Sequence, residues 1–235
     1  MEPMTHATIR DQDTDERVIP HYPNLWERAA DKWVHLSALA VFGLGAAVLV
    51  YLAATHGQAG LVVAAAVYGA ALIAMLAFST AYNLSHEGAA RPFLRRLDEA
   101  GIFLMIAGSY TPFTTQSLHG AWAWSMTILV WTIAAAGIVG KLLFSRISER
   151  AWTALYVLFG WVAVIALEPL RRSLPVAAFL LLLAGGLVYT AGSVLFLIRR
   201  LPFRRAAWHG MVCVGAALHF SAVLVGVMFA SAVTG

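Results

Sequence analysis

Polar side chains that suit metal or acid–base chemistry stand at the ends of three apolar segments. Ser79 and Asn83 close one segment, Asp98 opens another, and His209 opens the last. An ionisable residue at membrane depth is costly to bury and is usually kept for a function. The sequence therefore indicates a site more clearly than it indicates a reaction.

The composition is that of a chain surrounded mostly by lipid. Hydrophobic residues make up 60% of the sequence and charged residues only 12%, far from the balance of a soluble domain. The formal net charge is +4, but the basic residues lie between apolar runs and not on one amphipathic face. We expect membrane lipid as the partner and do not expect nucleic acid.

Seven apolar runs, each near the ~20 residues that a helix needs to cross a bilayer, alternate with short polar breaks. They cover about 34–54, 61–85, 98–116, 121–143, 151–168, 175–198 and 206–231. The pattern predicts an all-α seven-transmembrane bundle over residues 33–235, preceded by a soluble cytoplasmic segment, residues 1–32. The end of that segment, residues 25–33, suits either a short interfacial helix or a disordered lead-in.

Basic residues near span ends are retained on the cytoplasmic side, and they divide 14 to 2 between alternate breaks. This division predicts an N-terminus inside and a C-terminus outside. Asn83, Asp98 and His209 then lie at a similar depth near the inner face, with a cavity between spans 2, 3 and 7. On span 2, Ser79, Asn83 and His86 share one helix face.

The segment from Leu97 to Phe113, together with Ser79, Trp208-His209 and Leu218-His219-Phe220, resembles the haemolysin III branch of the progestin and adipoQ receptor family. The resemblance covers nearly all of the chain from span 1 onward and implies a bacterial plasma-membrane protein. It also implies a zinc ion near the inner face, bound by one histidine of span 2 and two of span 7, with Ser79 and Asp98 close by as catalytic residues.

Two of the three implied zinc ligands are replaced in this chain. Asn83 and Arg205 stand at two ligand positions, and only His209 remains. An amide oxygen is a poor zinc ligand and a guanidinium is not a ligand at all. We therefore expect no zinc in the family arrangement. If a metal binds, the available donors are His209, Asp98 and His86.

Arg205 lies four residues before His209 and so shares a helix face with it. A carboxylate that loses a neighbouring metal ion needs another cation. The sequence thus predicts an ion pair between Arg205 and Asp98, flanked by Asn83 and His209. The alternative is an Arg205 that faces lipid headgroups.

Three functions are compatible with these residues. The favoured hypothesis is a metal-independent or non-catalytic member that binds or senses lipid in the inner cavity. The first alternative, implied by the resemblance, is a zinc-dependent membrane hydrolase that cleaves a lipid amide as ceramidases do. The second alternative, suggested by the family name, is a pore-forming cytolysin, although no charged ring or amphipathic stripe supports a pore.

Overall fold

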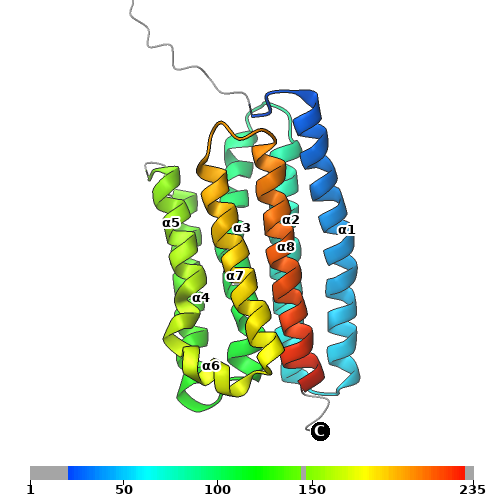
Figure 1. Cartoon of the computed structure of the whole chain (residues 1–235), viewed down its shortest axis with the longest axis vertical. Helices are drawn as coiled ribbons and strands as arrows, with labels where there is room; N and C mark the ends of the chain where they lie inside the picture. The colour runs from blue at the N-terminus through cyan, green and yellow to red at the C-terminus, as the bar shows by residue number, and fades with distance from the viewer. Residues whose placement is uncertain (1–20, 144–146, 231–235) are drawn as a thin grey trace, which may run out of the picture.

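The computed structural model describes residues 21–143 and 147–230, and within them long helices run side by side (Figure 1). The helices are α1 (Leu25–Thr55), α2 (Ala59–Leu84), α3 (Arg91–Gln116), α4 (Gly120–Leu143), α5 (Glu149–Gly160), α6 (Leu167–Ser173), α7 (Val176–Leu197) and α8 (Arg204–Val223). A 3₁₀ segment, Trp161–Ala166, joins α5 to α6, and a π-helical turn, Leu224–Met228, extends α8.

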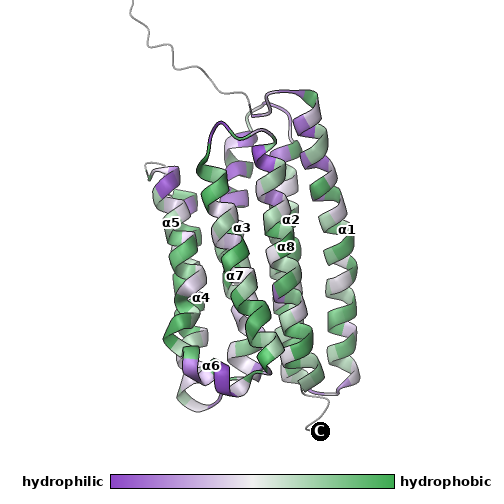
Figure 2. Ribbon diagram, viewed as in Figure 1, coloured by the Kyte–Doolittle hydropathy of each residue, from purple (hydrophilic) through white to green (hydrophobic). Residues whose placement is uncertain are grey.

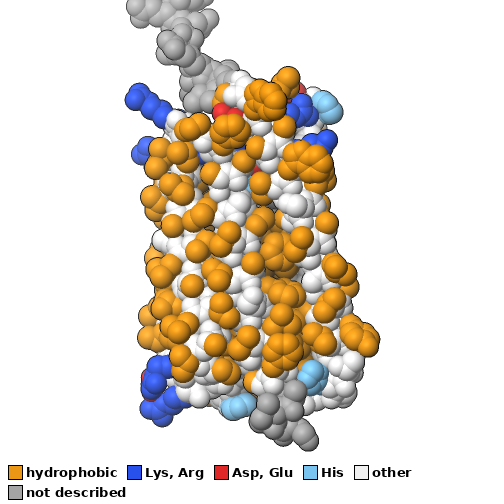
Figure 3. Space-filling view, turned by 45° about the vertical axis from the view of Figure 1, so that its right-hand side comes forward, with side chains coloured by type: hydrophobic (Ala, Val, Ile, Leu, Met, Phe, Trp, Pro, Cys, Tyr) orange, Lys and Arg blue, Asp and Glu red, His pale blue; other side chains and the backbone are white. Residues whose placement is uncertain are grey.

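Six helical segments in the described part of the chain are long and apolar enough to cross a membrane. They are α1, α2, α4, the α5–α6 segment, α7 and α8 with its π-helical turn. Helix α3 is as long as α2, but its first turns are rich in charged residues. Hydrophobic residues cover the middle of the bundle and polar residues gather at its ends (Figures 2 and 3). The protein is an all-α polytopic membrane protein.

The helices pack in succession and close on themselves through the first and the last. Helix α1 contacts both α2 and α8, α3 lies between α2 and α4, and α7 packs on α8. Helices α2 and α3 approach closely at Gly108, where a Cβ would meet the Cβ of Ala71 at 2.4 Å. A glycine at this position lets the two backbones pack tightly, and this contact fixes the depth of α2 relative to α3.

Two helices begin earlier than hydropathy predicts, and local signals explain both. Asn24 caps α1, since its Oδ1 accepts from the Glu27 amide at 2.9 Å, as in a capping box. Pro92 lies in the first turn of α3, where a proline costs no hydrogen bond. Residues 25–32, expected in the soluble segment, are therefore helical. Residues 1–20 of that segment lie outside the described residues.

Candidate metal centre

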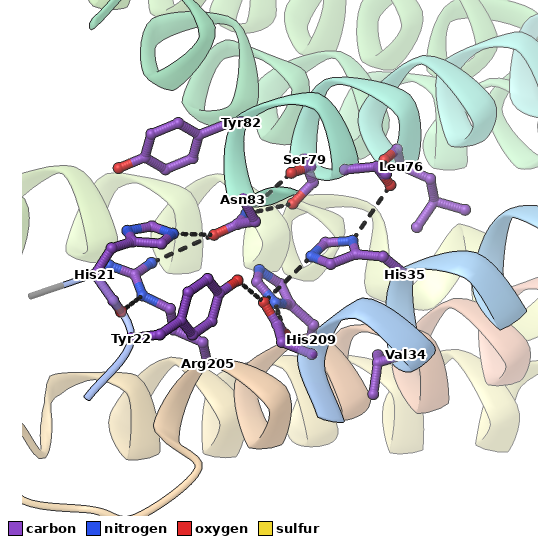
Figure 4. A network of polar contacts seen from close by, with 12 residues as sticks. His21, Tyr22, Val34, His35, Leu76, Ser79, Tyr82, Asn83, Arg205 and His209 are labelled. Carbon is purple, nitrogen blue, oxygen red and sulfur yellow. Dashed lines mark hydrogen bonds and ion pairs between the residues drawn. The ribbon is translucent and has the colours of Figure 1, made fainter. Parts of the chain in front are cut away.

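Three buried side chains meet at the end of the bundle where α1 begins, and Figure 4 shows this region. Asp31, His35 and His209 each offer one ligand atom, and these atoms lie within 4.8 Å of one another. Asp31 and His35 are four residues apart on α1 and so share a face, while His209 faces them from α8. The His35 and His209 ring centroids are 4.3 Å apart. We call these three residues the ligand group.

The carboxylate of Asp31 is fully buried and is held from two sides. Its Oδ1 lies 2.6 Å from Nδ1 of His209, and its Oδ2 accepts the hydroxyl of Tyr22, which lies just ahead of α1. Nε2 of His35 is 3.6 Å from the same Oδ2. A buried carboxylate is stable only when it is paired or hydrogen-bonded, and here the carboxylate also has its position fixed.

His35 presents a free nitrogen to the ligand group because Thr80 fixes its tautomer. The Thr80 hydroxyl donates its one hydrogen to the Leu76 carbonyl at 2.7 Å, so it can only accept from His35 Nδ1, 3.4 Å away. Nε2 then carries the lone pair. This buried Nε2 has no hydrogen-bond partner within the described residues, and its lone pair is thus available to a metal ion.

Asn83, at one ligand position of the resembled family, has no capacity left for a metal. Its amide nitrogen donates to the Ser79 carbonyl at 3.0 Å and lies 3.3 Å from the Ser79 hydroxyl. Its Oδ1 lies 3.1 Å from His21 Nε2 and 3.5 Å from Arg205 Nη1 (Figure 4). Two donors and two acceptor sites exhaust an amide, so Asn83 serves as a structural hydrogen-bonding residue.

Arg205 stands at the other family position and binds the segment that precedes α1. Its Nε donates to the His21 carbonyl at 2.9 Å, and its guanidinium lies 6.0 Å from the Tyr22 ring centroid. Burial, and then the nearby guanidinium of Arg205, lower the pKa of His21 to about 3, which keeps the ring neutral. The predicted Arg205–Asp98 ion pair is wrong: Arg205 has neutral oxygen partners instead.

Asp98 and Ser79 line a cavity of about 280 Å³ that also contacts His35 and His209. The Asp98 carboxylate forms a hydrogen bond with the Ser79 side chain and interacts electrostatically with His209 and His35. No ion pair involves Asp98 in the described part of the chain. The cavity continues between α3, α5, α7 and α8 along mostly apolar side chains. The cavity therefore has a polar end beside the ligand group, and the rest of its lining suits a hydrocarbon chain.

The structure brings together only part of the predicted site. His209 belongs to the ligand group, and Ser79 and Asp98 line the adjoining cavity. His86 is exposed in the connection after α2 and is not a member of that group. Sequence reasoning missed Asp31 and His35, although their four-residue spacing was a usable signal.

Comparison with known proteins supplies the family. The family model described as "Haemolysin-III related" matches residues 27–220. The chain belongs to the haemolysin III-related family. The chain is 39% identical to Hemolysin-3 of Bacillus cereus over 177 residues, 75% of this chain and 81% of the relative. It is 33% identical to a Hemolysin-3 homolog of Bacillus subtilis (strain 168) over 176 residues, 75% of this chain and 83% of the relative.

A more distant relative extends the comparison beyond bacteria. The human monocyte to macrophage differentiation factor is 26% identical over 207 residues, 86% of this chain and 84% of the relative. This match supports the link between this haemolysin III member and the progestin and adipoQ receptor family. The membrane-spanning helices and the Bacillus relatives indicate an integral protein of the bacterial plasma membrane.

The zinc ion implied for the family fits the donor atoms of the ligand group. It does not fit Asn83 and Arg205, which stand at the family's ligand positions. Two ligands of one tetrahedral zinc ion with bonds near 2 Å lie about 3.4 Å apart, and His35 Nε2 lies 3.6 Å from Asp31 Oδ2. The 2.6 Å contact between His209 and Asp31 is a hydrogen bond, which must open to admit an ion. Two imidazoles and one carboxylate form a donor set that catalytic zinc sites use.

Proposed function

We propose that this protein is a zinc-dependent membrane hydrolase of a lipid amide, with the ion held by Asp31, His35 and His209. The observation that supports it is the free Nε2 of His35, directed at a buried carboxylate and a second imidazole. The ligand group replaces the family ligand positions that Asn83 and Arg205 now occupy. The metal site has thus moved toward α1 while keeping one family ligand.

We propose further that α3 is a seventh span and that the ligand group faces the cytoplasm. Basic residues accumulate near the starts of α1, α3 and α8, and basic residues near span ends favour the cytoplasmic side. Helix α3 packs between α2 and α4, and its charged residues Arg95, Asp98 and Glu99 line cavities within the bundle. In this topology the N-terminus is inside and the C-terminus outside.

The cavity supports a lipid as substrate. Apolar and aromatic side chains from α1, α2, α3, α5, α7 and α8 line it, among them Met105, Ile106, Val157 and Val212. A hydrocarbon chain placed there removes apolar surface from water and leaves its polar end beside the ligand group. The amide bond of the lipid would then lie beside the ligand group and Asp98.

The residues around the ligand group have different roles in the proposed hydrolysis. Bound zinc would supply Lewis-acid chemistry and an activated water. Asp98 lines the same cavity as the two histidines and interacts electrostatically with both, so it is placed to accept a proton and pass it to the leaving amine. Ser79 lies beside Asp98 and orients that carboxylate. Tyr22 and Thr80 hold Asp31 and His35 in position.

Metal content and hydrolysis together test the proposal. Purified protein should carry about one zinc ion per chain and release a fatty acid from a lipid amide. His35→Ala should lose both properties, and Asp98→Asn should keep the zinc and lose the hydrolysis. His86→Ala is the matched control because that histidine is exposed and outside the cavity. A wild-type protein free of zinc after purification without chelators would refute the metal assignment.

A second candidate, metal-independent lipid binding, is favoured by one specific observation. Asn83 and Arg205 are engaged with each other and with His21, which leaves the family metal position filled by a stable polar network. In this case lipid binds in the cavity without turnover. Equal lipid affinity of the wild type and His35→Ala, with no zinc in either, would favour this candidate over the hydrolase.

A further inference from the structure

A second cavity, which we call the vestibule, lies beside the start of α3. Its volume is about 440 Å³, and four basic side chains line it: Arg91, Arg95, Arg96 and Lys141. It shares much of its wall with the inner cavity, namely Tyr82, Arg95, Glu99, Lys141, Glu149 and Trp152. The two spaces therefore adjoin, one lined by many charged side chains and the other mainly apolar.

The charged side chains of the shared wall neutralise one another. Glu99 on α3 pairs with Lys141 of α4 and with Arg95, whose Nε lies 3.0 Å away. Arg95 also reaches Glu149 of α5 at 2.8 Å. The Lys141 ammonium lies 4.6 Å from the Trp152 ring centroid. Two cations and two anions thus balance, so an additional anion must be bound by other groups.

Arg91 and Arg96 provide those groups. Arg91 donates from Nη1 to the Ser85 carbonyl at 2.9 Å, and its only carboxylate neighbour in the described residues, Glu87, is 3.7 Å away and mostly exposed. Its buried Nη2 has no hydrogen-bond partner in that part of the chain. Arg96 donates to the Leu142 carbonyl at 3.1 Å and has no carboxylate partner in residues 21–143 and 147–230.

We propose that the vestibule binds the phosphate headgroup of a single-chain lipid whose hydrocarbon chain enters the inner cavity. The planar guanidinium of Arg91 and that of Arg96 suit phosphate oxygens, and basic pockets between membrane helices at the cytoplasmic side take anionic headgroups. The inference rests on the proposed function, since it names the headgroup of the lipid in that cavity.

Binding of two probes with the same chain tests this assignment in detergent-solubilised full-length protein. The probes are oleoyl lysophosphatidic acid and mono-oleoylglycerol, which differ by the phosphate. Each guanidinium contact to a charged phosphate contributes roughly 10-fold in affinity. We expect the wild type to prefer the phosphate lipid, and Arg91→Gln or Arg96→Gln to reduce that preference roughly 10-fold.

Arg171→Gln is the matched control, because Arg171 is paired with Glu168 outside the vestibule. Repeating the measurement with His209→Ala separates this inference from hydrolysis: the phosphate preference should persist there even if the metal and the turnover are lost. Equal affinity for the two probes, or an unchanged preference in both vestibule variants, overturns the proposal. Competition by inorganic phosphate without discrimination between the lipids would assign the vestibule to free phosphate and also overturn it.

Discussion

Replacing Thr80 by valine tests whether the protein is built to present His35 to a metal ion. Valine keeps the shape of threonine and removes the hydroxyl that accepts from His35 Nδ1 at 3.4 Å. Without that acceptor, the proton is free to move to Nε2, the nitrogen in the ligand group. Loss of such an orienting partner lowers metal affinity by about 10- to 100-fold.

The geometry places the expected effect at the lower end of this range. A 3.4 Å contact is longer than a typical hydrogen bond, so we expect Thr80→Val to weaken zinc binding about 10-fold, equivalent to about 1.4 kcal/mol. Competition with a coloured chelator measures the dissociation constant. Thr80→Ser, which keeps the hydroxyl, should bind zinc as tightly as the wild type.

The reasoning is refuted if Thr80→Val binds zinc with unchanged affinity while His35→Ala loses the ion. That result would show that His35 coordinates the metal without help from Thr80. The absorption spectrum of a cobalt-substituted sample adds a second readout, since a change in ligand orientation alters it whereas a general loss of stability does not.

Three further predictions concern packing, pH and the displaced family site. Gly108→Ala should lower the melting temperature, because its Cβ would meet a side chain of α2 at 2.4 Å at a cost of ~1–3 kcal/mol, whereas Gly210→Ala, with nothing within 4 Å, should not lower it. The pKa of His21 falls from 6.5 to about 3 on folding, so its contribution to stability is present above pH 6.5 and is lost as the pH falls toward 3; His21→Gln should remove this part of the pH dependence of melting. Asn83→His combined with Arg205→His should create zinc binding that survives removal of the α1 ligands, and metal analysis of that variant checks it.

Hydropathy predicted an all-α polytopic membrane protein, which the structure confirms with six candidate spans in its described residues, because crossing a bilayer demands long apolar runs. It misplaced the start of α1, since the capping contact between Asn24 and Glu27 is a local signal weaker than the polar composition around it. The boundary at residue 32 then separated Asp31 from His35. Asp31 went unrecognised because its role depends on a helix over residues 25–33 that continues into the first span, whereas the sequence left that stretch open as a separate interfacial helix or a disordered lead-in.

The partners of Arg205 were beyond sequence reasoning for a different reason. A charge-balance argument favoured Asp98, the nearest acid expected at that depth. The structure instead gives Arg205 the carbonyl of His21 and the amide of Asn83. The contact to His21 joins residues 184 positions apart, and no periodicity in either segment predicts it.

The ligand group joins the first helix of the bundle to the last. Asp31 and His35 emerge early in synthesis, and His209 emerges near the end, so no partly made chain contains the complete donor set. Domains generally form from the N-terminus during synthesis, but the ligand group forms only after α8 inserts and packs against α1. If the ligand group binds zinc as proposed, the ion would be captured only after translation, once the bundle is complete.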